Sequence, residues 1–373
     1  MNEDDRAQTD VQDTRRWLHE LLRTTVQEEA SDLFLKTGSE PSLRIDGEVV
    51  FLGDRDVASS GRMSSAASLL LGDRLERFRK KGEMDLAYDA GAIGRFRVNV
   101  FRQRGKISAA FRHVPRDIPS FEELQLPASQ LQKLASHNSG IVLVTGVTGS
   151  GKSTTLAAMI DYMNDQHRRH IVTIEDPVEF VHQDRSCLIE QREVGLDTTS
   201  FEQALKHVVR QSPDVILIGE MRDQETIETA LNAAEIGHLV LSTLHTADAT
   251  RTLERIVSYF PPYQHELIRT QLSNSLRGIL SQKLLSSMKG KGRVPAVEVM
   301  MRTPTICDLI FKGETQKLNA AMDEDEYYGC QTFQRALIDL CEEKLITKQK
   351  ALDASPRPQD LRNALQGLRV RRG

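Results

Sequence analysis

Hydrophobic positions in the first part of the chain change from helical spacing to strict alternation. A helix that stops before Ser31 is predicted by five apolar residues that recur on one side: Trp17, Leu18, Leu21, Leu22 and Val26. The stretch SLRIDGEVVFL then places Asp46-Gly47 between two alternating runs, which predicts a hairpin because both central residues of a tight turn need positive φ. A charged helix near residues 69–79 and two strands around Arg104-Gly105 follow. The pattern predicts a small α+β domain.

Alternation in residues 94–101 separates two kinds of side chain. The apolar ones fall on one face of the predicted strand: Phe96, Val98 and Val100. Arg95 and Arg97 fall on the other face, and Arg112 at the end of the next strand would join them. Because neighbouring guanidinium groups repel, three explanations stay open: a solvated face with diffuse counterions, an acidic neighbour, or a bound phosphate.

Three prolines interrupt the pattern in HVPRDIPSFEELQLPAS and predict a linker over residues 115–128. From Ser129 onward, helix-length segments alternate with short apolar runs of the buried parallel-strand type: residues 171–174, 215–218 and 239–241. The predicted fold class is therefore α/β, with an α+β domain over residues 15–114 and a phosphate-loop domain over residues 129–373. The second domain should hold a mostly parallel sheet and C-terminal helices, and residues 1–14 are expected to be disordered.

Composition adds limits to this organisation. The chain has 373 residues, and none of its apolar stretches approaches the roughly 20 residues needed to span a bilayer. Its polar start, MNEDDRAQTD, is unlike a secretion signal, so we expect a cytoplasmic protein. No C-x-x-C pair occurs among its four scattered cysteines, which argues against a zinc site and against a disulfide framework: Cys187, Cys307, Cys330 and Cys341.

Charge gives no sign of a nucleic-acid partner. The formal net charge is −4, which provides no global attraction to nucleic acid or to anionic lipid. The tail from Arg369 to Arg372 is a local basic patch, although a solvated chain end is the simpler interpretation. We therefore expect no nucleic acid and no zinc among the ligands.

The stretch GVTGSGKSTTL carries the clearest chemistry. It follows the apolar run of residues 141–144 and opens a segment with helical spacing, which is the context of a nucleotide phosphate loop. Lys152 would reach the β- and γ-phosphate oxygens of ATP, and the Ser153 hydroxyl would bind Mg²⁺ at the positive end of a helix. The alternative is a Gly/Ser-rich turn without a ligand. The expected nucleotide-binding residues are Gly146, Val147, Thr148, Gly149, Ser150, Gly151, Lys152, Ser153 and Thr154.

Acidic and imidazole side chains follow the other predicted strands. Ligands bind at the carboxyl ends of parallel strands, so these residues should lie near the phosphate loop. Glu220 is placed to hold Mg²⁺ or its bound water, and Glu179 is the preferred general base, although either could instead cap a helix or form a salt bridge. His238 and His245 could both be core histidines. His245, beside Thr243, is the better candidate to sense the γ-phosphate.

Four segments together resemble the motifs of the secretion-superfamily ATPases. They correspond to that family's phosphate loop, aspartate box, second acidic motif and histidine box: GVTGSGKSTTL, TIEDPVEFVH, RQSPDVILIGEMRD and GHLVLSTLHTADA. Three further segments resemble the PilT/PilU branch, the type IV pilus retraction motors: SDLFLKTGSEPSLRIDGEV, GRFRVNVFRQR and SFEELQLP. The resemblance covers most of residues 15–365.

The resemblance implies a mechanism and an assembly. It implies a PAS-like N-terminal domain, a RecA-like ATPase domain and a homohexamer that hydrolyses ATP with Mg²⁺ to retract a pilus, for twitching motility or DNA uptake. By motif position, Arg97 and Arg112 would approach the nucleotide from the N-terminal domain, beside Glu179, Glu220 and His245. Implied partners are a PilC-like platform protein of the inner membrane, at the cytoplasmic base of the pilus, and a paralogous retraction ATPase.

One segment departs from the family pattern. Where PilT proteins tend to have A-I-R-N-L-I-R-E, residues 305–312 read T-I-C-D-L-I-F-K, which keeps Leu309 and Ile310 but loses both arginines and the asparagine. That segment is associated with retraction, so both a primary PilT-like role and an accessory PilU-like role stay open. The four-cysteine zinc motif of the assembly and secretion branches does not occur in this sequence, which favours the retraction branch.

The sequence leaves two other functions open as alternatives. A RecA-like motor acting on nucleic acid would share the phosphate loop but would need a basic channel or stacking aromatics, and aromatics make up only 5% of this chain. A regulatory subunit could bind nucleotide without hydrolysing it, although the presence of Lys152, Glu179 and Glu220 argues against that.

Overall fold

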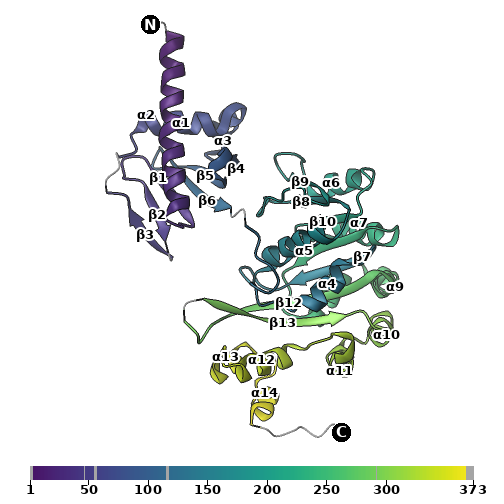
Figure 1. Cartoon of the computed structure of the whole chain (residues 1–373). Coiled ribbons are helices and arrows are strands. Elements are labelled where there is room, and N and C mark those ends of the chain that lie inside the picture. Colours follow the sequence, from purple (N-terminus) through teal and green to yellow (C-terminus); the bar gives the residue numbers. More distant parts are fainter. Residues whose placement is uncertain (1–2, 46, 54–56, 115–116, 291, 367–373) are drawn as a thin grey trace. The chain divides into compact units, whose positions relative to one another are not determined.

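Two compact units make up the chain, residues 1–117 and residues 118–373. The computed structural model describes residues 3–45, 47–53, 57–114, 117–290 and 292–366 (Figure 1). The basic tail from Arg369 to Arg372 lies outside the described residues. Among those described, no helix has the length and apolar character required to cross a membrane.

An antiparallel sheet of six strands forms the centre of the first unit. Its spatial order is β3-β2-β1-β6-β5-β4, and every pair of neighbours is antiparallel. The expected hairpin joins β2 to β3, with Ile45 opposite Glu48 and Gly47 at a φ of 88°. The strands are β1 (Asp32–Lys36), β2 (Ser42–Ile45), β3 (Glu48–Phe51), β4 (Glu83–Asp89), β5 (Arg95–Gln103) and β6 (Lys106–Val114).

Helices cover this sheet and complete its core. They are α1 (Glu3–Gln27), α2 (Ser60–Leu71) and α3 (Leu75–Lys81). The charged helix predicted near residues 69–79 is instead the end of α2, a short 3-10 turn and α3. The break falls at Gly72, whose φ of 49° lies in the left-handed region, where a glycine carries no steric cost.

The prediction of disorder over residues 1–14 is wrong for residues 3–14, because α1 begins at Glu3. Its packed part contains the apolar side predicted from the sequence, and Leu18 and Leu22 are fully buried. Extending a helix from an anchored segment adds one hydrogen bond per residue, and residues 3–14 contain neither glycine nor proline to stop it. Residues 1–2 lie outside the described residues.

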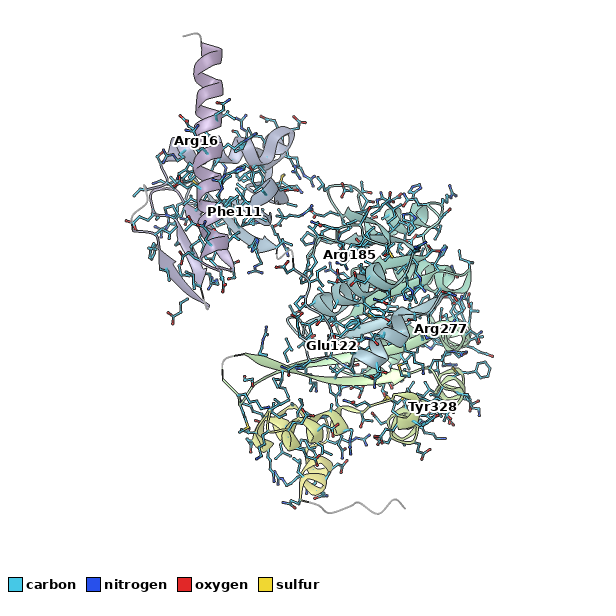
Figure 2. The ribbon with its side chains drawn as sticks, viewed as in Figure 1. Arg16, Phe111, Glu122, Arg185, Arg277 and Tyr328 are labelled. Carbon is cyan, nitrogen blue, oxygen red and sulfur yellow. The ribbon has the colours of Figure 1, made fainter. Side chains whose placement is uncertain are left out.

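The alternation in β5 is confirmed by burial. Phe96, Val98 and Val100 are fully buried, whereas Arg97 is exposed. β5 joins β6 through Arg104 and Gly105, which both have positive φ, as a two-residue hairpin requires. Phe111 of β6 lies in the same core (Figure 2). One face of the sheet therefore holds the first unit together and leaves the other free for charged groups.

The second unit is built on a seven-stranded, mostly parallel sheet, which confirms the predicted α/β class. Its order is β13-β12-β7-β11-β10-β8-β9, and only β12 and β13 are antiparallel to each other. The strands are β7 (Gly140–Thr145), β8 (His170–Glu175), β9 (Leu188–Glu193), β10 (Val215–Ile218), β11 (Leu239–Leu244), β12 (Leu276–Ser286) and β13 (Arg293–Met301).

Eleven described helices accompany this sheet, and several begin at a short polar side chain that accepts a backbone N–H. Asp223 caps α7 in this way and Asp248 caps α8, each accepting from the residue three positions later. The helices are α4 (Ala128–Ala135), α5 (Lys152–Gln166), α6 (Phe201–Val208), α7 (Gln224–Glu235), α8 (Ala249–Ser258), α9 (His265–Ser275), α10 (Pro304–Lys312), α11 (Leu318–Glu324), α12 (Phe333–Glu342), α13 (Lys348–Ala354) and α14 (Pro358–Leu365).

A separate apolar cluster lies between β13 and the last three helices. Val294 and Ala296 of β13 pack with Phe333 and Leu337 of α12 and with Leu361 of α14. Figure 1 shows α12, α13 and α14 gathered beside the β12–β13 hairpin. The C-terminal helices are thus attached to the sheet through β13.

Much of the segment predicted as a linker packs on the second unit. Phe121 and Leu126 are buried in the core of that unit, and the boundary between the units falls after Asp117. The prolines break the periodicity without exposing the chain, because isolated apolar residues between them still bury their side chains.

All four cysteines are free thiols.

Replacing Phe111 with alanine should destabilise the first unit by about 3–5 kcal/mol, since the truncation leaves a cavity in a fully buried site. Trp17, the only tryptophan, packs against the same core, so its fluorescence during urea unfolding reports on this unit. Phe51→Ala is the matched control because Phe51 is 63% exposed. Equal losses in the two variants would contradict the assigned core.

Candidate active site

The phosphate loop connects β7 to α5 through glycines that the geometry requires. Gly146, Gly149 and Gly151 have φ values of 145°, 78° and 92°. A Cβ on Gly146 would lie 2.5 Å from the carbonyl oxygen of Gln282 and 2.5 Å from the Oγ of Ser150. The loop is therefore closely packed against β12 at its base, while residues 147–149 are exposed at its tip.

Donors at this turn fit an anionic phosphate. Gly151 is the N-cap of α5 and provides no side-chain acceptor for the N–H groups of the first turn, which carry the positive end of the helix dipole. The Oγ of Ser150 is buried and has no hydrogen-bond partner among the described residues. Such N–H groups and hydroxyls bind phosphate oxygens in nucleotide-binding proteins.

Lys152 lies over the backbone of its own loop. Its Nζ donates to the carbonyl oxygens of Gly146, at 2.9 Å, and Val147, at 3.2 Å. Burial lowers the pKa of Lys152, and the negative charges of Glu220 and Glu179 oppose that effect. Because both carboxylates act on this ammonium, the structure brings together the lysine and the two acids that the sequence singled out.

Glu220 and His245 lie at the ends of adjacent strands. Ile218 of β10 is paired with Ser242 of β11, so the residues that follow both strands meet. The Nε2 of His245 is 3.4 Å from one carboxylate oxygen of Glu220, and the Nη2 of Arg222 is 2.9 Å from the other. Burial alone would raise the pKa of Glu220, but the hydrogen bond and charge of Arg222, with His245, outweigh burial and lower it. Glu220 is thus kept as a carboxylate.

His238 has a different role. It lies before β11, at the opposite end of that strand, and its Nδ1 is 2.7 Å from the carbonyl oxygen of Pro213. This contact joins the segments that lead into β10 and β11. His238 is therefore a structural residue, and of the two histidines only His245 lies with Glu220.

A second carboxylate supports the loop that carries Glu179. Glu175, at the end of β8, accepts hydrogen bonds from the Oγ1 of Thr173 at 2.8 Å and from the Nε2 of Gln191 at 3.2 Å. It also accepts the backbone N–H of Glu179 at 3.4 Å, and burial raises the pKa of Glu175. The peptide bond between Asp176 and Pro177 in this loop is cis. Glu175 thus holds the loop, while the side chain of Glu179 is exposed.

The side-chain oxygens of Ser153 and Glu220 are suited to act as ligands for Mg²⁺. Ser153 is half-buried in the first turn of α5. Mg²⁺ in nucleotide sites takes most of its ligands from phosphate oxygens and water and few from the protein. Within the described ranges no cluster of three or more His, Cys, Asp or Glu side chains is arranged to hold a metal by itself. The residues present fit a cation that is shared with a bound nucleotide.

In the first unit, Arg97 and Arg112 face each other across β5 and β6 as paired residues. The Nε of Arg112 is 2.9 Å from one oxygen of Asp32, and the Nε of Arg44 is 3.3 Å from the other. An acidic neighbour therefore exists for Arg112. Arg97 is exposed and forms no hydrogen bond or ion pair with any described residue. Among the described residues, Arg97 therefore has no acidic neighbour of the kind that Arg112 has.

Several residues of the site were missed by sequence reasoning. Arg222 follows Glu220 by two positions and could have been found as a cation beside an acid. Gln282 and Gln191 contribute from strands β12 and β9, far along the chain, and no local pattern marks them. Asp32 was given no role from the sequence, although it pairs with Arg112 eighty positions away.

Comparison with known proteins identifies the family. The model of the type II/IV secretion system protein family matches residues 7–345. The chain belongs to this family. The type IV pilus ATPase PilU of Pseudomonas aeruginosa is 42% identical over 342 residues, which cover 92% of this chain and 89% of PilU. The retraction ATPase PilT of the same organism is 40% identical over 341 residues, which cover 91% of this chain and 98% of PilT.

A solved structure agrees along nearly the whole chain. The crystal structure of the pilus retraction motor PilT with bound ADP has a TM-score of 0.87 and 43% identity, and the match covers 92% of this chain and 98% of PilT. The Legionella pneumophila ATPase DotB matches with a TM-score of 0.72 and 25% identity. The two-unit architecture of this secretion-family protein is therefore the one found in PilT.

We expect Gly146→Ala to destabilise the second unit by at least about 2 kcal/mol, because positive φ and close packing both oppose a side chain there. Gly149→Ala is the matched control: its φ is also positive, but nothing lies within 4 Å of its Cβ, so strain alone should cost about 1 kcal/mol. Urea unfolding followed by circular dichroism measures both. Indistinguishable losses would show that the loop is not packed against Gln282.

Proposed function

We propose that this chain is an ATP-hydrolysing motor that drives retraction of a type IV pilus. The observation that carries the proposal is the convergence of Lys152, Glu220 and His245 at the phosphate loop, on a chain that resembles PilT and PilU along nearly its whole length. The PilT structure with ADP supports ATP as the nucleotide. The same resemblance supports an assembly of six copies in a ring.

In this mechanism the loop amides and the N-terminus of α5 bind the phosphates, and Lys152 exchanges its two carbonyl partners for β- and γ-phosphate oxygens. Ser153 and Glu220 would hold Mg²⁺, which when bound would neutralise charge on the phosphate oxygens. Both oxygens of Glu220 already have cationic or imidazole partners, so its position and its ionised state are fixed. His245, in contact with Glu220, is placed to report on the γ-phosphate.

Glu179 suits the task of orienting the attacking water. Its carboxylate is exposed and forms no hydrogen bond with any described side chain, while Glu175 holds its backbone. Both carboxylate oxygens of Glu220, in contrast, are already paired with Arg222 and His245, which lower its pKa and leave it poorly suited to accept a proton. We therefore assign Glu179 as the general base and Glu220 as the metal and water ligand.

Arg97 and Arg112 belong to the other unit, so any contact with the nucleotide would be made across a domain or subunit junction. A guanidinium brought to the γ-phosphate stabilises charge in the transition state and makes hydrolysis depend on closure of that junction. This dependence would couple the chemistry to movement. The expected site of action is the cytoplasmic base of the pilus, on a PilC-like platform protein of the inner membrane.

The segment over α10 bears on whether the motor acts alone or with a paralogous ATPase. Ile306, Leu309 and Ile310 are buried, while the positions of the two lost arginines are held by Cys307 and by Phe311, which is 49% exposed. Asp308 and Lys312 pair with each other at 2.7 Å. On this helix a thiol and a phenyl ring occupy the positions where PilT proteins tend to have arginines. This difference favours the accessory, PilU-like role.

The purified protein should hydrolyse ATP only with Mg²⁺, and DNA should not change the rate. Lys152→Ala should weaken nucleotide binding at least about tenfold, because it removes the phosphate cation, whereas Glu220→Ala should bind nucleotide and lose turnover. Binding of a fluorescent ATP analogue and phosphate release measure the two steps. Normal binding by the Lys152 variant, together with near-normal turnover by the Glu220 variant, would contradict the assignment.

In cells, loss of the gene should leave pili that extend but retract poorly.

Arg97→Ala and Arg112→Ala should each lower kcat at least about tenfold, the lower end for loss of a transition-state cation. Assembly should persist, because both side chains are exposed. Arg95→Ala, on the same face of the same strand, is the control and should have a milder effect. Steady-state kinetics on rings whose mass is verified by light scattering gives the answer. Unchanged kcat in both variants would leave these arginines as a solvated basic face.

A further inference from the structure

Glu298 is a carboxylate in the interior of the second unit, outside the site described above. It lies on β13 and is 2% exposed. Strand alternation places it on the same face as Val294 and Ala296, which belong to the apolar cluster with the C-terminal helices. Across the sheet it is paired with Ser281 of β12, whose Oγ accepts a hydrogen bond from Thr145 just before the phosphate loop.

This carboxylate lies at the N-termini of two helices and caps one of them, α8. It accepts the backbone N–H of Ala249, the first residue of α8, at 2.8 Å. The backbone N–H of Phe333, the first residue of α12, acts on the same carboxylate and lowers its pKa, and both residues line one pocket. The first N–H groups of a helix have no partner inside the helix, and the N-terminus carries positive partial charge, so an ionised carboxylate suits both ends. Glu298 thus joins a helix of the ATPase core to a C-terminal helix.

The segment that leads into α8 carries His245. Only three residues separate His245 from Ala249, and Asp248 caps α8 by accepting the N–H of Arg251 at 2.8 Å. The hydroxyls of Thr246 and Thr252 lie 2.6 Å apart and fold the segment against the first turn of α8. The start of α8 therefore sets where the imidazole of His245 lies relative to Glu220.

We propose that Glu298 is a positioning residue for ATP hydrolysis, which caps α8 to hold His245 against Glu220 and, through its place beside the start of α12, couples that contact to the C-terminal helices. The inference rests on the proposed function for its effect on turnover. The link itself depends only on the hydrogen bond from Ala249 to Glu298 and on the place of Glu298 beside the start of α12. Movement of α12 would then be transmitted to the histidine at the strand end through a single side chain.

Ionisation of Glu298 costs stability. Burial raises its pKa to about 7; Asp248 acts in the same direction, while the N–H groups of Ala249 and Phe333 and the charge of Lys283 oppose it. Other charged groups line the adjoining pocket of 300 Å³: Arg251, Glu254, Asp323 and Arg357. Since the folded pKa lies above the unfolded value, the folded state favours the protonated acid, and this stabilisation is lost as pH rises through about 7. A charge retained at such a cost is typical of a functional constraint.

The test is Glu298→Gln, with Glu254→Gln as the matched control because Glu254 lines the same pocket but is exposed. At pH 8 the glutamine should raise backbone hydrogen exchange over residues 245–252 about tenfold, since a neutral side chain caps α8 less well. It should lower kcat about three- to tenfold and leave KM within about twofold. Below pH 6, where Glu298 is protonated, wild type and variant should converge.

Thermal stability separates this role from a simple packing defect. The Tm of the wild type should fall relative to that of Glu298→Gln between pH 5.5 and 8, because only the wild type ionises a buried group. Unchanged exchange over residues 245–252 at pH 8 would overturn the proposal, as would equal effects of Glu254→Gln. If the wild type hydrolysed no ATP but exchange still changed in the variant, the link would stand and the proposed function would fail.

Discussion

The parallel alignment of β7, β11, β10 and β8 is the constraint on which the rest of this molecule depends. Parallel neighbours end at the same edge of a sheet, so the phosphate loop, Glu179, Glu220 and His245 gather there although 99 positions separate Gly146 from His245. Backbone hydrogen bonds fix the positions of the strands, and they thereby also fix where the residues after each strand begin. Arg222 and Glu175 then hold the side chain of Glu220 and the backbone of Glu179 in place.

How far the sequence predicts this structure depends on the range of the interactions. The phosphate loop, the two hairpins and the buried face of β5 follow from local spacing, because turn geometry and strand alternation are properties of a few consecutive residues. The split of the expected helix at Gly72 and the helical start at Glu3 were missed, since propensity alone does not decide where a packed helix breaks or how far it extends. Phe121 and Leu126 show that proline-rich segments can still be buried.

Long-range polar contacts were the part that the sequence did not predict. Asp32 binds Arg112, Gln282 packs on Gly146, and Glu298 caps α8. Each pairs residues that are distant in the chain, and a single Asp, Gln or Glu has no spacing that reveals its partner. The family resemblance supplied the roles of the motif residues. Glu298 lies outside those motifs, because its carboxylate acts on backbone groups rather than on the nucleotide.

The facing arginines of the first unit connect its stability to the ionic medium. Arg112 and Arg44 both contact Asp32, and Arg97 lies opposite Arg112 on the next strand, so repulsion among these guanidinium groups raises the free energy of the folded unit. Salt screens such repulsion over about 8 Å at physiological ionic strength. A polyvalent anion bound at this face would relieve the same repulsion at far lower concentration. A substitution that reduces this repulsion should therefore also weaken the binding of such an anion.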